Sequence, residues 1–340
     1  MERKRGRKVR RKAIRGSKRI KEGKLEEAGA PGNAWLSNDE VLLKSIMKKK
    51  DVLKGKNASL LLHALSVLSK SMRDITYREG FSIGKMLFAM SSKGKRYSFY
   101  EESIPELVSF LESAGLGQVT YTAFPNKLTI RIYSDGYYLG AKIHAFEAGL
   151  ISGYVSTGRH EYSHVVEKAC VNDNSEYCEF EFYGNAIEEG SEIESSSLLD
   201  RTIDGIIASS GNSLAHSYLS LLSKVVTNRS YKDEMSALMA YIGEGLGKRL
   251  LSNGRRSARL EKAIEIAGDI CIAEPKIERT KPFSISMAFD GTRISKEFVN
   301  LSLSFLGGFL PKLSSAKELK AIEINRYNLH KIRIAEAPRG

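Results

Sequence analysis

The second half of this 340-residue chain repeats the order of sequence patterns found in the first half. Apolar residues recur at helical spacing, then alternate as in strands, and then return to helical spacing before a second strand pair. In the first half these patterns predict helices at 37–50, 57–74, 81–90 and 104–114, strands at 118–124 and 127–133, a helix at 140–156, and strands at 160–167 and 179–183. A pattern that occurs twice predicts two copies of one α+β domain.

Short matched segments, offset by roughly 155 residues, support the repeat. The matched pairs are Gly80–Lys85 with Gly243–Lys248, Leu128–Gly136 with Phe283–Gly291, and His144–Tyr154 with Val299–Phe309. We therefore expect two tandem helix-plus-antiparallel-sheet domains, the first at 37–185 and a second, degenerate one at 186–340. A basic tail and linker at 1–36 precede them.

Positive charge is concentrated at the N-terminus. The net charge is +13, but residues 1–24 contain 13 Lys or Arg against two Glu, so this segment carries +11 and the remainder only +2. We expect a segment so charged and so poor in apolar side chains to be disordered when free. Dense Arg and Lys neutralise phosphates, so nucleic acid is the expected partner, with RNA slightly preferred over DNA. The expected phosphate-binding residues are Arg3, Lys4, Arg5, Arg7, Lys8, Arg10, Arg11, Lys12, Arg15, Lys18 and Arg19.

Two alternatives for the tail stay open. The tail can serve solubility alone, or it can be attracted to anionic lipid, although it lacks bulky apolar anchors. No stretch reaches the roughly 18 apolar residues of a membrane span, so no membrane partner is expected. Three cysteines are too few and too odd in number for a disulfide framework, which favours a reducing compartment and a cytoplasmic location.

One group of residues has the composition of a metal site. Glu167, Cys170 and Cys178 follow the spacing Glu-x2-Cys-x7-Cys around a predicted hairpin turn, and His144 precedes them on a helix. Carboxylate, thiolate and imidazole are ligands of tetrahedral zinc, and four protein ligands make a zinc site structural. The alternative is that both cysteines are small buried residues and that His144 bonds a backbone carbonyl.

These residues resemble the 4-vinyl reductase domain family. The resemblance rests on Gly149-Leu-Ile-Ser-Gly153, on Glu167-Lys-Ala-Cys170 and on Cys178-Glu-Phe180, together with the upstream Gly80–Lys85 and Leu111–Gly117 segments. It covers residues about 75–183 well and residues about 238–335 as a degenerate copy that has lost the cysteines.

The resemblance implies an α+β fold with an apolar pocket beside the helix–sheet contact, used in bacterial transcription activators to sense small aromatic molecules. It also implies structural zinc held by Glu167, Cys170, Cys178 and a residue on the preceding helix, where His144 lies. The aromatic residues that could line the pocket, or simply form the core, are Phe81, Phe88, Tyr138, Phe146 and Tyr154.

A second motif matches a metalloprotease signature. His160-Glu-Tyr-Ser-His164 fits His-Glu-x-x-His, which requires a helix to bring both imidazoles to one ion. We read a strand here, and a strand separates these side chains by roughly 13 Å. No other set of residues suggests an enzyme.

The preferred hypothesis is a non-enzymatic factor associated with ribosomal RNA or DNA, with tandem 4-vinyl reductase-like domains, structural zinc in the first domain and a phosphate-binding tail. One alternative is a sensor or transcriptional regulator that binds a small apolar ligand. A further alternative is a scaffold that forms homodimers.

Overall fold

The computed structural model divides the chain into two units, Met1–Trp35 and Leu36–Gly340. It describes residues 53–54, 56–134, 139–183, 195–208, 214–227, 231–252, 256–280, 283–291, 294–313, 319–326 and 329–336, all of which belong to the second unit. The basic tail, the predicted helix at 37–50 and the residue Tyr138 lie outside these ranges.

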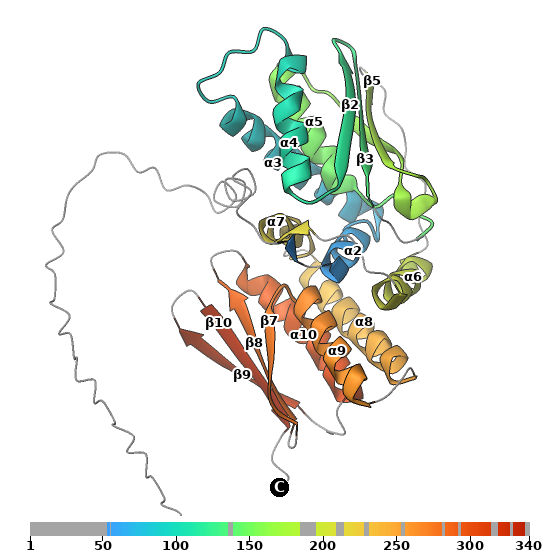
Figure 1. The fold of residues 1–340 in the computed structure, drawn as a ribbon, viewed down its shortest axis with the longest axis vertical. Coiled ribbons are helices and arrows are strands. Elements are labelled where there is room, and N and C mark those ends of the chain that lie inside the picture. Colours follow the sequence, from blue (N-terminus) through green and yellow to red (C-terminus); the bar gives the residue numbers. More distant parts are fainter. Residues whose placement is uncertain are drawn as a thin grey trace, which may run out of the picture. The chain divides into compact units, whose positions relative to one another are not determined.

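The first sheet has four antiparallel strands in the order β2-β3-β5-β4. Its strands are β2 (Gln118–Phe124), β3 (Lys127–Tyr133), β4 (Val165–Ala169) and β5 (Cys178–Tyr183), and its helices are α3 (Lys70–Ser91), α4 (Ile104–Ser113) and α5 (Ala145–Arg159), with short 3-10 turns at Tyr100–Ser103 and Val171–Asp173. The helices lie on one side of the sheet (Figure 1). The apolar strand residues Leu128, Ile130, Ile132, Phe180 and Phe182 are buried.

The second sheet has the same strand order, β7-β8-β10-β9. Its strands are β7 (Glu274–Thr280), β8 (Phe283–Asp290), β9 (Leu319–Arg326) and β10 (Leu329–Glu336), and its helices are α8 (Lys232–Ser252), α9 (Arg256–Ile270) and α10 (Lys296–Leu313). The predicted α+β class is thus confirmed, and the described part of the chain contains the same order of helices and strands twice (Figure 1).

In each half, glycines bring two long helices together. A Cβ on Gly80 of α3 would lie 2.2 Å from the carbonyl oxygen of Phe146 on α5, and a Cβ on Gly243 of α8 would lie 2.2 Å from that of Phe305 on α10. Any side chain larger than hydrogen would push these helix backbones apart. The glycines therefore fix the position of α5 against α3, and of α10 against α8.

These contacts correct the predicted repeat alignment. The sequence match placed His144–Tyr154 opposite Val299–Phe309, but the contacts make Phe146 equivalent to Phe305. The difference is four residues, about one helical turn. One turn preserves the apolar face of a helix, so sequence periodicity alone does not detect such a shift.

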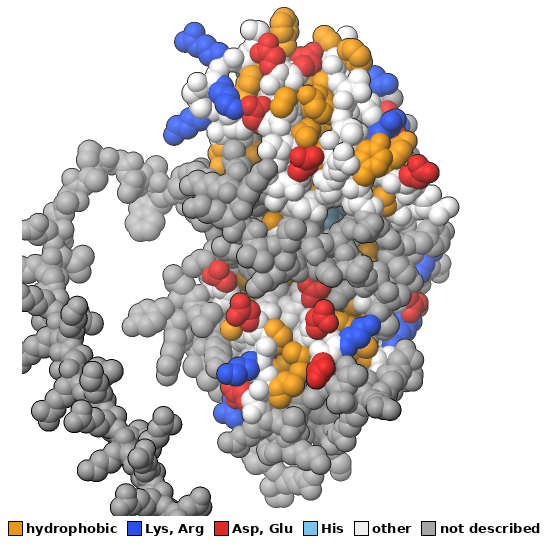
Figure 2. All heavy atoms as spheres, viewed as in Figure 1, with side chains coloured by type: hydrophobic (Ala, Val, Ile, Leu, Met, Phe, Trp, Pro, Cys, Tyr) orange, Lys and Arg blue, Asp and Glu red, His pale blue; other side chains and the backbone are white. Residues whose placement is uncertain are grey.

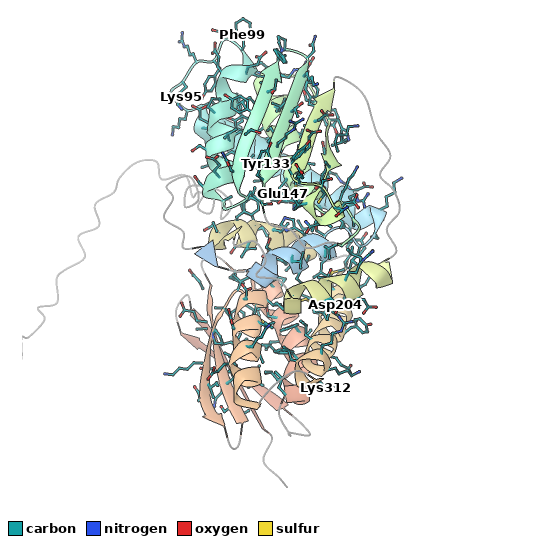
Figure 3. The ribbon with its side chains drawn as sticks, turned by 45° about the vertical axis from the view of Figure 1, so that its right-hand side comes forward. Lys95, Phe99, Tyr133, Glu147, Asp204 and Lys312 are labelled. Carbon is teal, nitrogen blue, oxygen red and sulfur yellow. The ribbon has the colours of Figure 1, made fainter. Side chains whose placement is uncertain are left out.

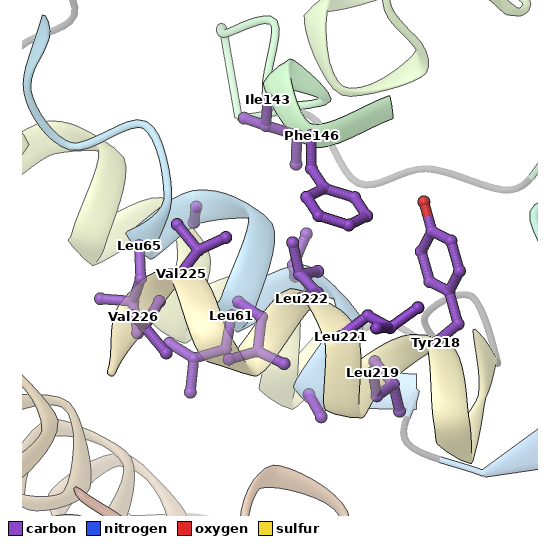
Figure 4. Close-up of a cluster of buried hydrophobic side chains, with 14 of the residues drawn as sticks. Leu61, Leu65, Ile143, Phe146, Tyr218, Leu219, Leu221, Leu222, Val225 and Val226 are labelled. Carbon is purple, nitrogen blue, oxygen red and sulfur yellow. The ribbon is translucent and has the colours of Figure 1, made fainter. Parts of the chain in front are cut away.

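Short lead-in segments join the two halves. Strand β1 (Leu53–Lys54) pairs antiparallel with β6 (Leu214–Ala215). Helix α2 (Lys56–Leu65) follows β1, helix α6 (Ser195–Ala208) precedes β6, and helix α7 (His216–Val226) follows β6. Helix α2 contacts both α6 and α7. Apolar side chains of α2 and α7 form a buried cluster with Ile143 and with Phe146 of α5, and the Phe146 ring meets the Tyr218 ring edge-on at 5.8 Å (Figure 4).

Several predicted helix and strand boundaries differ from those in the structure. The helix predicted at 57–74 ends at Leu65, because the Ser69 side chain accepts a hydrogen bond from the Met72 N–H and begins α3 there. The predicted strand at 160–167 begins only at Val165, because α5 continues to Arg159 and ends with His160 in the left-handed conformation. Strands β2 and β3 match their predicted ranges.

Adjacent glycines on α10 provide a matched test of the helix contact. A Cβ on Gly308 would lie 2.1 Å from the Ala240 carbonyl oxygen, whereas a Cβ on Gly307 meets nothing within 4 Å. We expect Gly308→Ala to lower the free energy of unfolding by about 1–3 kcal/mol, as overpacking does. Gly307→Ala should be neutral or raise it by up to about 1 kcal/mol, because Ala favours helix. Urea denaturation measures both, and equal effects of the two substitutions would refute the contact.

Candidate metal centre

Three elements of the first half place their polar side chains at one point. Glu167 lies on β4 and Cys178 begins β5, and both belong to the sheet face that packs against the helices, while Cys170 directly follows β4. His144 is the residue before α5. The pairing of β4 with β5 shifts register between Glu167 and Ala169, and this irregularity precedes Cys170.

The four side chains that the sequence singled out lie together. One ligand atom from each of His144, Glu167, Cys170 and Cys178 lies within 4.8 Å of the others, so the group could hold a metal ion. His144 Nδ1 is 2.7 Å from Glu167 Oε1, 3.4 Å from Cys170 Sγ and 3.6 Å from Cys178 Sγ. The two sulfur atoms are 4.0 Å apart.

These separations agree with the edges of a zinc tetrahedron. Zinc–sulfur bonds of about 2.3 Å and zinc–nitrogen bonds of about 2.0 Å give sulfur–sulfur and sulfur–nitrogen edges of about 3.8 and 3.5 Å. Among the separations given above, the hydrogen bond between His144 and Glu167 is clearly shorter than the corresponding edge, about 3.3 Å. Bound zinc would therefore require these two side chains to separate by roughly half an ångström.

Neighbouring groups orient the ligands. The backbone N–H of His144 donates to Glu167 Oε2 at 3.0 Å, which leaves Oε1 facing the imidazole and the sulfurs. The Val171 N–H donates to Cys178 Sγ at 3.5 Å, and the Asn172 amide donates to Cys170 Sγ at 3.7 Å. Hydrogen bonds of this kind stabilise thiolates and fix ligand geometry.

The charges of the ligands bear on metal uptake. Burial, aided by the hydrogen bond from Cys178, raises the pKa of the Cys170 thiol. Burial alone would lower the pKa of His144, but the Glu167 carboxylate and the Cys170 sulfur raise it well above 6.5. A metal ion binds thiolates and neutral imidazole, so binding must release protons from these groups.

Burial of the ligands determines what the centre can do. Cys170 and Cys178 are buried, and the side chains of His144 and Glu167 are 12% and 7% exposed. Four protein ligands complete a tetrahedron and leave no position for a substrate or a water molecule. The arrangement therefore suits a structural ion that ties α5 to the β4–β5 hairpin.

A second polar cluster, which sequence reasoning missed, lies beside the centre. His63 on α2 contacts Glu147 of α5 through Nε2 and Oε1 at 2.6 Å, and the Tyr218 hydroxyl of α7 donates to the same oxygen at 3.0 Å. Glu147 is labelled in Figure 3, and it is fully buried. The available signal was the presence of polar side chains, His63 and Glu147, on the apolar faces of two predicted helices.

The four predicted pocket aromatics that the structure describes, Phe81, Phe88, Phe146 and Tyr154, do not line the cavity beside the metal centre. A small cavity of about 20 Å³ is lined by Ser59, His63, Leu116, Ile132, Ser134, His144, Glu147, Cys178 and Phe180, and by none of the predicted aromatics. Phe146 and Tyr154 are buried, and the Tyr154 hydroxyl donates to the Ser103 carbonyl at 2.9 Å. The Phe88 ring lies against Tyr154, and the Phe81 ring lies near Tyr162.

The metalloprotease-like motif does not form a metal site. His160 ends α5 and is exposed, while His164 Nδ1 hydrogen-bonds the hydroxyls of Tyr77 and Tyr162 at 3.0 and 3.1 Å.

The expected phosphate-binding residues of the tail lie outside the described residues. Among the described helices, none is both long enough and apolar enough to cross a bilayer.

Comparison with known proteins gives no identification. No family model, no curated protein and no solved structure matches this chain.

Removal of one sulfur ligand tests the centre against a matched control. We expect protein purified without chelators to contain about one zinc per chain, and Cys178→Ser to reduce the zinc content to near zero, because zinc strongly prefers thiolate. Cys271→Ser should retain the zinc, since Cys271 is also buried but does not belong to the ligand group. Elemental analysis of the folded proteins measures this. A metal-free wild type, or equal loss in both variants, contradicts the assignment.

Proposed function

We propose that this protein is a non-enzymatic, nucleic-acid-associated factor. In this proposal the folded body consists of two 4-vinyl reductase-like halves, structural zinc stabilises the first half, and the N-terminal tail binds phosphates. The observation that carries the proposal is the separation of charge along the chain. Residues 1–24 hold +11 of the net +13, in a chain whose other 316 residues are nearly neutral.

The surface of the body supports the tail as the phosphate-binding part. On the face shown in Figure 2, the Lys and Arg side chains of the described residues are interspersed with Asp and Glu and form no single basic patch. Several described cations are also paired, such as Arg131 with Glu179 and Arg249 with Asp204. Paired charges on a neutral surface contribute little to the attraction of a polyanion.

The interior gives less support to a small-molecule sensor. The cavity beside the metal centre measures about 20 Å³, which is room for about one water molecule and not for an aromatic ring. The four described aromatics considered for a ligand pocket make contacts with one another or with neighbouring side chains and backbone.

Truncation tests the proposed function. We expect the full chain to bind duplex RNA and DNA with an affinity that falls steeply with salt, because each neutralised phosphate releases counterions. A chain of residues 25–340 should lose most of this affinity and most of the salt dependence. Fluorescence anisotropy over a series of KCl concentrations measures both, with RNA and DNA of equal length compared directly.

A scrambled tail is the matched control. A variant with residues 1–24 in shuffled order keeps the +11 charge. It should bind as the natural chain does, since phosphate contacts carry no sequence information. Undiminished binding by residues 25–340 would move the site to the body and contradict the proposal.

A further inference from the structure

The buried carboxylate of Glu147 has an oxygen that no protein group satisfies. Glu147 Oε1 receives the Tyr218 hydroxyl and contacts His63, but Oε2 has no hydrogen-bond partner. A buried carboxylate oxygen without a partner is costly, because it has lost its water without a replacement. Such an atom in a native structure therefore indicates a missing partner.

Glu147 carries a negative charge. His63 Nδ1 donates to the Ser59 carbonyl at 2.7 Å, and a carbonyl only accepts. The other ring nitrogen, Nε2, faces Glu147 Oε1 at 2.6 Å. Burial alone would raise the pKa of Glu147, but the adjacent His63, with a smaller contribution from His144, lowers it to about 2.

The cavity places this carboxylate next to the metal centre. Glu147 and His144 both line it, as do Cys178 and the hydroxyl-bearing Ser59 and Ser134. Its volume of about 20 Å³ exceeds the 10–15 Å³ or so that one water needs. The His144 ring also contacts the His63 ring, with centroids 5.0 Å apart.

The second half provides an internal comparison. With the helix alignment fixed by the glycine contacts, His144 corresponds to Leu303 and Glu147 to Leu306 on α10. Leu306 is buried in the core, and Leu303 is partly buried and packs against the core. The two polar residues are thus present together in one half and replaced by leucines together in the other, which suggests that they serve the same site.

We propose that Glu147 is a positioning residue of the metal centre, which holds the His144 imidazole in its ligating orientation through a water molecule bound in this cavity. The proposal rests on the proposed structural zinc. When His144 binds the ion through Nδ1, its other ring N–H requires an acceptor, and metal-bound histidines usually find a carboxylate, a carbonyl or a water. Through His63 and Tyr218 the same carboxylate connects the centre to α2 and α7.

Three substitutions separate positioning from stability. Loss of such a carboxylate typically costs 10–100-fold in metal affinity, so Glu147→Gln should weaken zinc binding by that factor. Glu147→Asp keeps the charge and should recover most of the affinity. Tyr218→Phe removes a hydrogen bond to the same carboxylate but no charge, so it should lower the melting temperature and change zinc affinity less than about threefold. Competition with a chromophoric chelator measures affinity in each folded protein.

Cobalt gives a readout that a purely structural role would not change. The thiolate-to-cobalt bands should persist in Glu147→Gln, because both cysteines remain, while the ligand-field bands should shift as the imidazole loses its orientation. Affinity and ligand-field bands equal to those of the wild type would overturn the inference. Equal losses in Glu147→Gln, Glu147→Asp and Tyr218→Phe would also overturn it, since they would indicate stability alone.

A measurement on the natural chain covers the case in which Glu147→Gln fails to fold. A crystal structure of the zinc-loaded protein should show an ordered water within hydrogen-bond distance of Glu147 Oε2 and His144 Nε2. A filled metal centre without that water overturns this inference and leaves the structural zinc intact. A wild type that binds no zinc refutes the proposed zinc itself.

Discussion

The contact of helix backbones at glycine residues is the interaction on which the rest of the body depends. In the first half, Gly80, Gly84, Gly149 and Gly153 bring α3 and α5 so close that any Cβ would meet backbone within 2.2 Å. A helix held in this way cannot slide or rotate without breaking the contact. Because His144 precedes α5 and Glu147 is in its first turn, the same contact sets where both groups face the sheet.

The sequence was most informative where the pattern was local. Strands β2 and β3 were predicted to the residue, because alternating apolar side chains flank the tight turn at Pro125-Asn126. The ligand group was predicted because one carboxylate and two thiols lie around a predicted hairpin turn and His144 lies on the helix before it, and because this pattern resembles that of a known family. Helix boundaries were less accurate, since Ser69 begins a new helix inside a continuous apolar periodicity.

Features that depend on contacts between distant segments could not be predicted. The repeat alignment of α10 was wrong by one turn, because leucine and phenylalanine continue along its apolar face and only the backbone contacts fix the register. The pair of His63 and Glu147 joins residues 84 positions apart. Each of these residues, taken alone, is an ordinary polar residue in a helix, and only the fold brings them together in a buried site.

The pairing of β1 with β6 affects the order in which the body can be assembled. Lys54 lies opposite Leu214, and the apolar face of α2 packs against α7, so the first elements of the body depend on segments that are synthesised much later. A growing chain can form the first sheet and its helices as local units, but α2 lacks its contact with α7 until the chain has been made as far as Val226. Part of the apolar surface of α2 therefore stays uncovered in the nascent body from the time α2 is made until α7 is made, and translation of the second lead-in is the event that covers it.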